Sequence, residues 1–289
     1  VLNDYAERLK MRQRPSVVAS IDQAEPAQLN LVTAPTDYAA QPGTAEPTAG
    51  KVAFESLEAA VRGLRAEQLH AIVTLPINKL VIQQEGFKFP GHTEYLAERF
   101  AVDDNLMLFV YGEFRLTLAT AHLPLQHVSE RLSRMLILRK LDLLTEALQQ
   151  DFGIEHPVIA LLGLNPHAGD GGLLGIEEQT IIKPAMEMAR QQNMRVVGPF
   201  AADGFFVHDA YRRYDATLAM YHDQGLIPFK HITKGAGVNY TAGMPIIRTS
   251  PDHGTAYDIA GKGVADTAST LEAIKLALQI LRVRKRAST

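Results

Sequence analysis

The chain has 289 residues, of which 46% are apolar, and it carries a formal net charge of −3 at pH 7. That length fits one large or two ordinary α/β domains, and the weak charge gives no support to a nucleic-acid or membrane-surface ligand. Cysteine is absent, which excludes disulfides, thiolate metal sites and cysteine nucleophiles. No apolar run reaches the roughly 18 residues of a membrane span and no signal peptide is recognisable, so we expect a cytoplasmic protein.

The first quarter of the chain is predicted to be partly irregular. A helix is expected over residues 1–14 and a short strand near 16–19. Residues 22–47 are rich in Ala, Pro, Gln and Thr and indicate an irregular excursion over the surface. An apolar stripe predicts a helix over 48–68, and the run HAIVTL at 70–75 predicts a strand.

From residue 87 onward, apolar segments of strand type and helix type alternate, which predicts an open α/β sheet. The segment 87–100 is expected to contain a helix that begins near His92 and Thr93, and a helix N-terminus favours anions. The later expected elements are strands at 106–110 and 116–121, a helix over 128–150, a strand at 158–164, a helix over 177–192, strands at 195–197 and 216–221, a possible helix start at 255–260 and a helix over 270–283.

Three of the ten histidines lie just beyond the ends of predicted strands: His122 and His222 follow directly, and His167 follows after Asn165 and Pro166. Ligands of open α/β sheets bind beyond the carboxyl ends of the strands, so these side chains share one expected location. A single histidine there is usually a polar loop residue, but three imidazoles together describe a catalytic site for Zn²⁺ or a similar divalent ion. Asp203, expected in a loop, could be a fourth ligand or could orient one imidazole.

A set of anion-binding side chains follows the last of these histidines. Gly225 and Pro228 are expected to break any continuation of the strand that ends near residue 221, and Lys230, Asn239 and Arg248 follow on glycine-rich loops. Lysine and arginine are mostly solvated surface residues, yet both cations here come directly after apolar segments. Their geometry suits a phosphate group. Neither a GxGxxG fingerprint after a strand nor a P-loop occurs, so no cofactor-binding residue is assigned.

Several longer motifs together resemble one family. They are GHTEYLAE (91–98), TAHLPL (120–125), LGLNPHAGDGG (162–172), MYHDQGLIPFK (220–230), GVNYTAG (237–243) and IRTSPDHGTAYDIAG (247–261). They resemble the 4-hydroxythreonine-4-phosphate dehydrogenase family of pyridoxal 5′-phosphate biosynthesis, and the likeness covers nearly the whole chain. Members usually open with a strand and a Gly/Pro-rich loop that has no counterpart before Val1, so we expect that segment to be missing here.

The resemblance implies an α/β fold like that of isocitrate and isopropylmalate dehydrogenases. Two α/β domains would enclose a cleft: residues 1–94 with 252–289 in the first, and residues 95–251, with the metal site and the dimer interface, in the second. Family members are homodimers with active sites at the subunit interface. We expect His122 and His167 to form a local pair and His222 to complete the metal site of the opposite subunit.

The resemblance also assigns the site residues. His122, His167 and His222 match the family's ligands for a divalent metal (Zn, Mg or Co), and Asp203 matches an aspartate near that metal and is the candidate catalytic residue. The family's substrate contacts fall on His92, Thr93, Lys230, Asn239 and Arg248.

The implied activity is NAD- or NADP-dependent oxidation of 4-phosphooxy-L-threonine at C3, followed by decarboxylation to 3-amino-2-oxopropyl phosphate. One alternative is a paralogous dehydrogenase that acts on a phosphothreonate, a phosphoerythronate or a cis-dihydrodiol carboxylate. Two alternatives of other classes are a metal-dependent hydrolase with three histidine ligands and a non-catalytic protein that binds a phosphorylated ligand.

Overall fold

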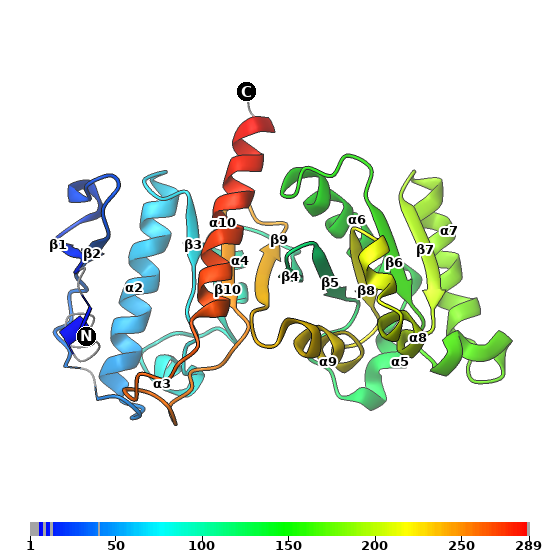
Figure 1. Cartoon of the computed structure of the whole chain (residues 1–289), viewed down its shortest axis with the longest axis horizontal. Coiled ribbons are helices and arrows are strands. Elements are labelled where there is room, and N and C mark those ends of the chain that lie inside the picture. Colours follow the sequence, from blue (N-terminus) through cyan, green and yellow to red (C-terminus); the bar gives the residue numbers. More distant parts are fainter. Residues whose placement is uncertain (1–5, 8–9, 12–13, 40, 288–289) are drawn as a thin grey trace.

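The structure is a computed structural model that describes residues 6–7, 10–11, 14–39 and 41–287. It is a mixed α/β architecture built on one large sheet, which confirms the expected fold class (Figure 1). None of the helices in these ranges is long and apolar enough to cross a membrane. The expected helix over residues 1–14 falls mostly outside the described residues.

The central sheet has eight strands in the order β3-β10-β9-β4-β5-β8-β6-β7. Strands β5, β8, β6 and β7 are mutually parallel, while β4 is antiparallel to both of its neighbours. The strands are β3 (Ala71–Val73), β4 (Leu106–Tyr111), β5 (Phe114–Leu118), β6 (Val158–Leu162), β7 (Arg195–Phe200), β8 (Ala216–Ala219), β9 (Val238–Ala242) and β10 (Ile247–Pro251).

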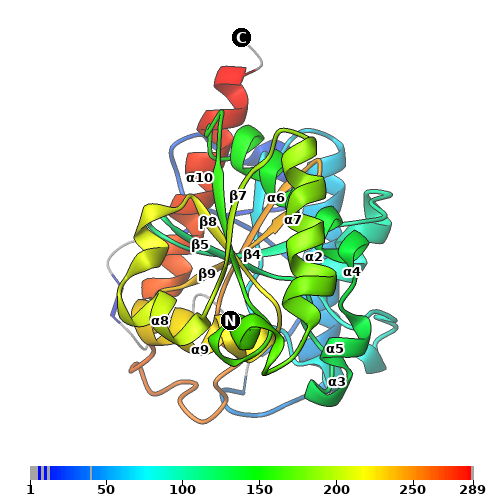
Figure 2. The same cartoon turned by 90° about the vertical axis from the view of Figure 1, so that its right-hand side faces the viewer.

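Helices cover both faces of this twisted sheet, as the view along it shows (Figure 2). The α-helices are α2 (Pro47–Arg65), α3 (Lys79–Gln84), α4 (His92–Arg99), α5 (Val128–Arg131), α6 (Arg134–Gln150), α7 (Lys183–Gln191), α8 (Ala202–Val207), α9 (His222–Thr233) and α10 (Ala268–Ala287). One apolar core lies between the sheet and α6, α7 and α10, and a second lies between the sheet and α8 and α9. Leu108 belongs to the first core and the next residue, Phe109, to the second, as expected for a strand buried on both faces. A third core joins α2, α3 and α4 to β3.

Two expectations in the less regular segments are corrected. The segment predicted as irregular contains β2 (Asn30–Val32), which pairs in parallel with β1 (Ser16–Val18) in a separate two-stranded sheet. The helix start expected at 255–260 does not form, and turns and bends occupy that stretch instead. Gly254 and Gly261 flank this stretch, and a glycine carries a large backbone-entropy cost in a helix.

The strand ends before residue 222, as expected, but the segment after it was expected to be loop and is helical, because α9 continues through Gly225 and Pro228. A proline inside a helix costs about 3 kcal/mol. The same helix buries Leu226 and Phe229 against the sheet, and each fully buried apolar side chain contributes about 1.5–3 kcal/mol, so burial outweighs the penalty. Gly225 is needed for close approach, because a Cβ there would lie 2.7 Å from Leu116 Cδ2.

Replacing Gly225 tests this close packing. Gly225→Val should lower the free energy of unfolding by about 2–3 kcal/mol, because the added methyl groups overpack the contact between α9 and β5. Gly204→Val is the matched control, since an added Cβ at Gly204 in α8 meets no atom within 4 Å. The control should change stability by less than about 0.5 kcal/mol in urea unfolding. Equal losses in both variants would contradict the packing argument.

Candidate functional site

The histidines that follow β5 and β8 lie together. Hydrogen bonds from Ala119 N to Ala219 O (2.8 Å) and from Thr120 N to Met220 O (3.2 Å) continue the pairing of the two strands beyond their ends. The chain therefore reaches His122 and His222 at the same edge, and their ring centroids are 6.1 Å apart. His222 begins α9, and its Nδ1 lies 2.7 Å from Asp223 Oδ1.

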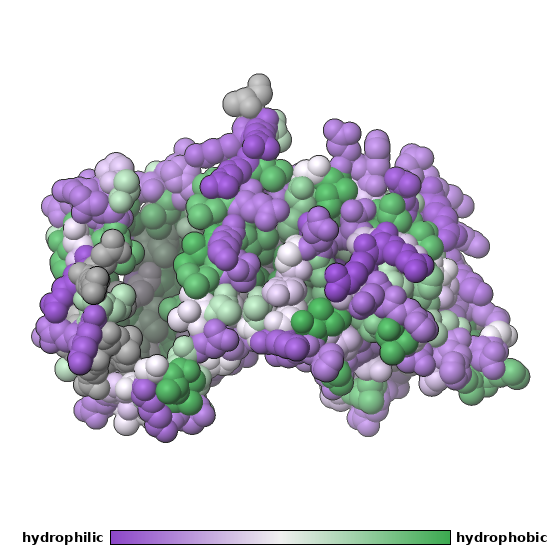
Figure 3. All heavy atoms as spheres, viewed as in Figure 1, coloured by the Kyte–Doolittle hydropathy of each residue, from purple (hydrophilic) through white to green (hydrophobic). Residues whose placement is uncertain are grey.

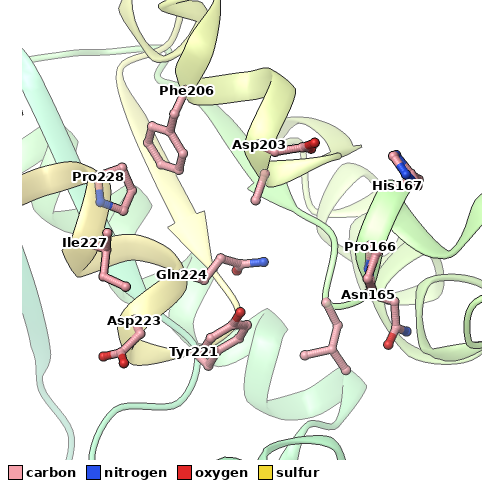
Figure 4. Close-up of a pocket in the computed structure, with 12 residues that line it drawn as sticks. Asn165, Pro166, His167, Asp203, Phe206, Tyr221, Asp223, Gln224, Ile227 and Pro228 are labelled. Carbon is pink, nitrogen blue, oxygen red and sulfur yellow. The ribbon is translucent and has the colours of Figure 1, made fainter.

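His167 lies apart from this pair, although β6 is the next strand to β8. The chain after β6 turns through a run of left-handed residues, and His167 itself has φ 52°. His167 lines a cavity of about 520 Å³ together with Asp203, Tyr221 and Gln224. Figure 4 shows Asp203 and His167 on the same side of this cavity. Across the described residues of the single chain, no group of three His, Asp or Glu side chains could hold a metal.

The local pair therefore differs from the one expected. His122 pairs with His222, whereas His122 with His167 was predicted. The reason is the sheet order, because β8 lies between β5 and β6 although it comes later in the chain. Asp203 also differs from expectation, since it belongs to the first turn of α8 and not to a loop.

Two imidazoles are a suitable but incomplete metal site. A 6.1 Å separation of ring centroids lets both rings face one ion with each nitrogen about 2.0–2.1 Å from it. A catalytic zinc site of this type has three protein ligands. The imidazoles of His122 and His222 are thus suitable ligands for a divalent ion, but one chain supplies only two of the three ligands that such a site needs.

Arg248 is a buried cation in the middle of β10, only 5% exposed. Its Nε donates to Thr74 Oγ1 (3.0 Å), and its Nη1 donates to Thr241 Oγ1 (2.9 Å) and Thr93 Oγ1 (3.4 Å). Burial lowers its pKa to about 10 and the nearby Glu94 opposes that shift, so the guanidinium stays charged at pH 7. A buried cation held by three hydroxyl groups and no paired carboxylate in the described structure is prepared for an anionic ligand.

His92 and Thr93 form the first turn of α4, as predicted. Burial, and then the charge of Arg248, lower the pKa of His92 to about 4. The imidazole is therefore neutral at pH 7 and can donate or accept a hydrogen bond without competing with Arg248 for charge.

Lys230 in α9 and Asn239 in β9 both reach the C-terminal end of β10, where Lys230 is near Asp252 and Asn239 pairs with Ser250. Lys230 lies in the last turn of α9, which differs from the loop position expected for it. Its Nζ is 3.5 Å from Asp252 Oδ1. The side-chain oxygen of Asn239 is buried and has no hydrogen-bond partner in the part of the chain that the structure describes.

Asp252 was not among the predicted site residues. Burial raises its pKa, and the neighbouring Lys230 is the largest influence that opposes this rise. The sequence contained one signal, because Asp252 follows directly after β10 in the motif SPDHGTA.

The low pKa of His92 predicts a pH dependence of stability. Between pH 7 and pH 5 the unfolded chain protonates this histidine near its ordinary pKa of about 6.5, while the folded protein does not. The free energy of unfolding is therefore highest above pH 6.5 and decreases as the pH falls towards 4. At pH 5 the His92 contribution has lowered it by about 2 kcal/mol. Urea unfolding of wild type and His92→Asn at both pH values isolates this contribution, and an identical pH dependence in the two proteins would refute it.

Three comparisons place this chain among known proteins. The family model described as "Pyridoxal phosphate biosynthetic protein PdxA" matches residues 1–277. A 4-hydroxythreonine-4-phosphate dehydrogenase of Bacteroides thetaiotaomicron is 46% identical over 284 residues, which cover 98% of this chain and 78% of that protein.

Two solved structures are also similar. A 4-hydroxythreonine-4-phosphate dehydrogenase from Klebsiella pneumoniae superimposes with a TM-score of 0.82 and 33% identity, covering 95% of this chain and 86% of the other. A terephthalate 1,2-cis-dihydrodiol dehydrogenase from Burkholderia xenovorans has a TM-score of 0.64 and 30% identity, covering 96% and 87%. With a family model spanning nearly its whole length, this chain belongs to the PdxA family of pyridoxal phosphate biosynthetic proteins.

Proposed function

We propose that the protein is a dehydrogenase that oxidises 4-phosphooxy-L-threonine at C3 with NAD or NADP and releases CO₂ to give 3-amino-2-oxopropyl phosphate, in pyridoxal phosphate biosynthesis. The family match over residues 1–277 is the observation that carries this proposal. A cytoplasmic location is part of it, as for a biosynthetic enzyme with small diffusible substrates.

The phosphate of the substrate is assigned to the cationic region around β10. Arg248 is the central contact, because its buried guanidinium has no carboxylate partner at salt-bridge distance in the described structure. The first turn of α4 supplies a helix N-terminus at His92 and Thr93. Lys230 adds a second cation at the end of α9, and Asn239 adds an amide group. Fixing the phosphate at one end of the substrate positions C3 relative to the histidine pair.

The divalent metal is assigned to the histidines. His122 and His222 of one chain would hold it, with Asp203 and His167 as the further candidates on the neighbouring cavity. When bound, a divalent ion supplies Lewis acidity that stabilises negative charge on the substrate oxygen during oxidation and decarboxylation. Asp203 is the candidate base for the proton of the hydroxyl group, since its exposed carboxylate borders the cavity that His167 lines.

We assign the third ligand to His167 of a second copy of this chain. The segments that follow His122 and His167 in the chain carry exposed apolar side chains, which are Leu123, Leu125, Met135, Leu173, Leu174 and Ile176. The two segments adjoin, because Ser129 Oγ donates to Glu177 Oε1 at 2.7 Å and Arg134 Nε donates to Thr180 O at 2.9 Å. An apolar surface beside an incomplete site is what a two-fold dimer with shared sites requires.

The nucleotide is assigned to a separate, mostly apolar cavity of about 710 Å³. Its walls come from residues 41–44, α2, the segment 75–82 and the segment 253–270. This volume lies in the usual range of about 300–1,000 Å³ for ligand pockets. His253 borders it and follows Asp252, so a nicotinamide ring could approach the substrate from this side. The cleft between the two proposed domains, 1–94 with 252–289 and 95–251, would contain both ligands. In the space-filling view the lower outline is hollowed along α9, between α3 and α5 (Figure 3).

A second candidate substrate is a cis-dihydrodiol carboxylate. It is favoured by the likeness to the Burkholderia xenovorans terephthalate dihydrodiol dehydrogenase. Such a substrate carries a carboxylate where the first candidate carries a phosphate dianion, and Arg248 can bind either group.

Formation of NADH or NADPH tests the function directly. With 4-phosphooxy-L-threonine and a divalent metal, we expect nucleotide reduction that a chelator removes and added metal restores. The panel should include phosphothreonate, phosphoerythronate and a cis-dihydrodiol carboxylate. If one of these compounds gives a higher kcat/KM than 4-phosphooxy-L-threonine, that compound becomes the assigned substrate. Product formation without a nucleotide would indicate a hydrolase, and ligand-dependent thermal stabilisation without turnover would indicate a binding protein.

The shared site predicts which inactive variants complement each other. A mixed dimer of His122→Ala and His167→Ala subunits contains one intact site, because His122 and His222 come from one chain and His167 from the other. Random reassortment of equal amounts should restore about a quarter of the wild-type activity, since half of the dimers are mixed and each has one intact site.

The pair His122→Ala and His222→Ala is the matched control, and it should stay inactive because each site loses one of its two local ligands. Activity in the control pair, with none in the first pair, would show that His222 is the residue supplied by the partner. Inactivity of both pairs in verified mixed dimers would place all three ligands in one subunit.

A further inference from the structure

The loop that carries His167 is held in an unfavourable conformation. Residues 167–171 all have positive φ values, and His167, Ala168 and Asp170 among them are not glycine (φ 52°, 51° and 42°). For such residues the left-handed region costs roughly 1–2 kcal/mol each, and runs of them are unusual. A conformation of this kind persists only where surrounding contacts determine it.

Those contacts converge on Glu178, whose side chain is buried (1% exposed) at the start of a π-helical turn, η4 (Glu178–Ile182). Its Oε1 accepts hydrogen bonds from Leu164 N and Asn165 N, both at 2.7 Å. Its Oε2 accepts a third from Asn165 Nδ2 at 3.0 Å. The carboxylate thus fixes the two residues at which the chain leaves β6 and turns into the left-handed run.

Close approach at two glycines adds to this anchoring. A Cβ at Gly163 would lie 2.8 Å from Ala168 Cα and 3.1 Å from Glu178 Oε1. A Cβ at Gly169 would lie 2.7 Å from Glu178 Oε2. The loop is therefore folded around the carboxylate, with no space for a side chain between them.

We propose that Glu178 is a positioning residue for the metal site, which holds the loop so that His167 projects from the subunit towards the second copy of the chain. This inference rests on the proposed ligand role of His167. Glu178 does not line the cavity that contains His167 and Asp203, so it acts through the loop and not on the substrate. A glutamate suits this task because three N–H donors face it, and the amide group of a glutamine would turn a donor towards some of them.

Glu178→Gln is the direct test, and Asp151→Asn is its matched control. Asp151 is also buried (2% exposed) and accepts hydrogen bonds from Tyr240 Oη and Arg284 Nε, both at 2.6 Å, but it ties α6 to β9 and α10 and does not contact the His167 loop. Asn165→Ala is a second variant that keeps the buried carboxylate. It removes one of the three hydrogen bonds to Glu178 and also the hydrogen bond from Asn165 Nδ2 to Glu177 Oε2 at 2.8 Å.

Three measurements on the dimeric protein separate positioning from general stability. Equilibrium dialysis with Zn²⁺ should give a 10- to 100-fold weaker metal affinity for Glu178→Gln, as is typical when a group that orients a ligand is lost. Excess Zn²⁺ should restore much of its kcat/KM. Hydrogen–deuterium exchange should accelerate in residues 164–172. Asn165→Ala should show the same changes to a smaller extent, and Asp151→Asn should show none of them while its melting temperature falls.

The outcomes also separate this inference from the proposed function. His167→Ala should weaken metal binding at least as much as Glu178→Gln. If His167→Ala loses the metal while Glu178→Gln and Asn165→Ala bind it like wild type, the positioning role of Glu178 is wrong and the ligand role of His167 is retained. If His167→Ala binds metal like wild type, the ligand role fails and the positioning role fails with it. Equal loss of affinity in Asp151→Asn would show that the effect is general destabilisation and would overturn the proposal.

Discussion

The parallel pairing of β5 with β8 is the constraint on which the site depends. Backbone hydrogen bonds continue this pairing as far as Thr120 and Met220, two residues before each histidine. The positions of His122 and His222 are therefore set by main-chain geometry and need no support from their own side chains. The same pairing directs α9 away from the strand end, and α9 carries Lys230 towards β10. One strand contact thus fixes both the histidine pair and one of the cations.

Burial decides the electrostatics of the region around Arg248 and His92, to which we assign the phosphate of the substrate. The Arg248 guanidinium and the His92 imidazole lie close enough for their charges to interact, and both are largely removed from water. Only one of them can be charged at low cost, and the arginine keeps its proton because its ordinary pKa is about six units higher. The result is a single buried positive charge beside a neutral ring. An anionic group that enters this region replaces the lost hydration of Arg248, which gives binding energy that an exposed arginine could not supply.

The sequence predicted the alternation of strands and helices and the three strand-end histidines, because buried strands have a strong local signal. It could not predict which strands are neighbours, and so the local pair of histidines was assigned wrongly. The order β5-β8-β6 places a later strand between two earlier ones, and no local pattern encodes that order. The segment with Gly225 and Pro228 was interpreted as loop, since the local preference of these residues was weighed without the burial of Leu226 and Phe229 that outweighs it. Asp252 was missed because its contact with Lys230 joins residues more than twenty positions apart.

The loop after β6, whose residues 167–171 have positive φ values, relates local backbone conformation to the position of His167. A histidine on a relaxed loop after β6 would be free to turn back towards its own chain, where β8 and β6 are neighbours. In the observed loop, which has a run of positive φ values, His167 is exposed, and the exposed Leu173 and Ile176 follow it in the chain. The conformational cost of the loop is offset by buried hydrogen bonds to the Glu178 carboxylate. The loss of such a bond costs about 1–3 kcal/mol when it leaves a buried group unpaired. Strain of this kind is tolerated where it serves a site. If His167 is the third metal ligand, as we propose, this conformation separates it from His122 and His222, and the metal site would then depend on the association of two subunits.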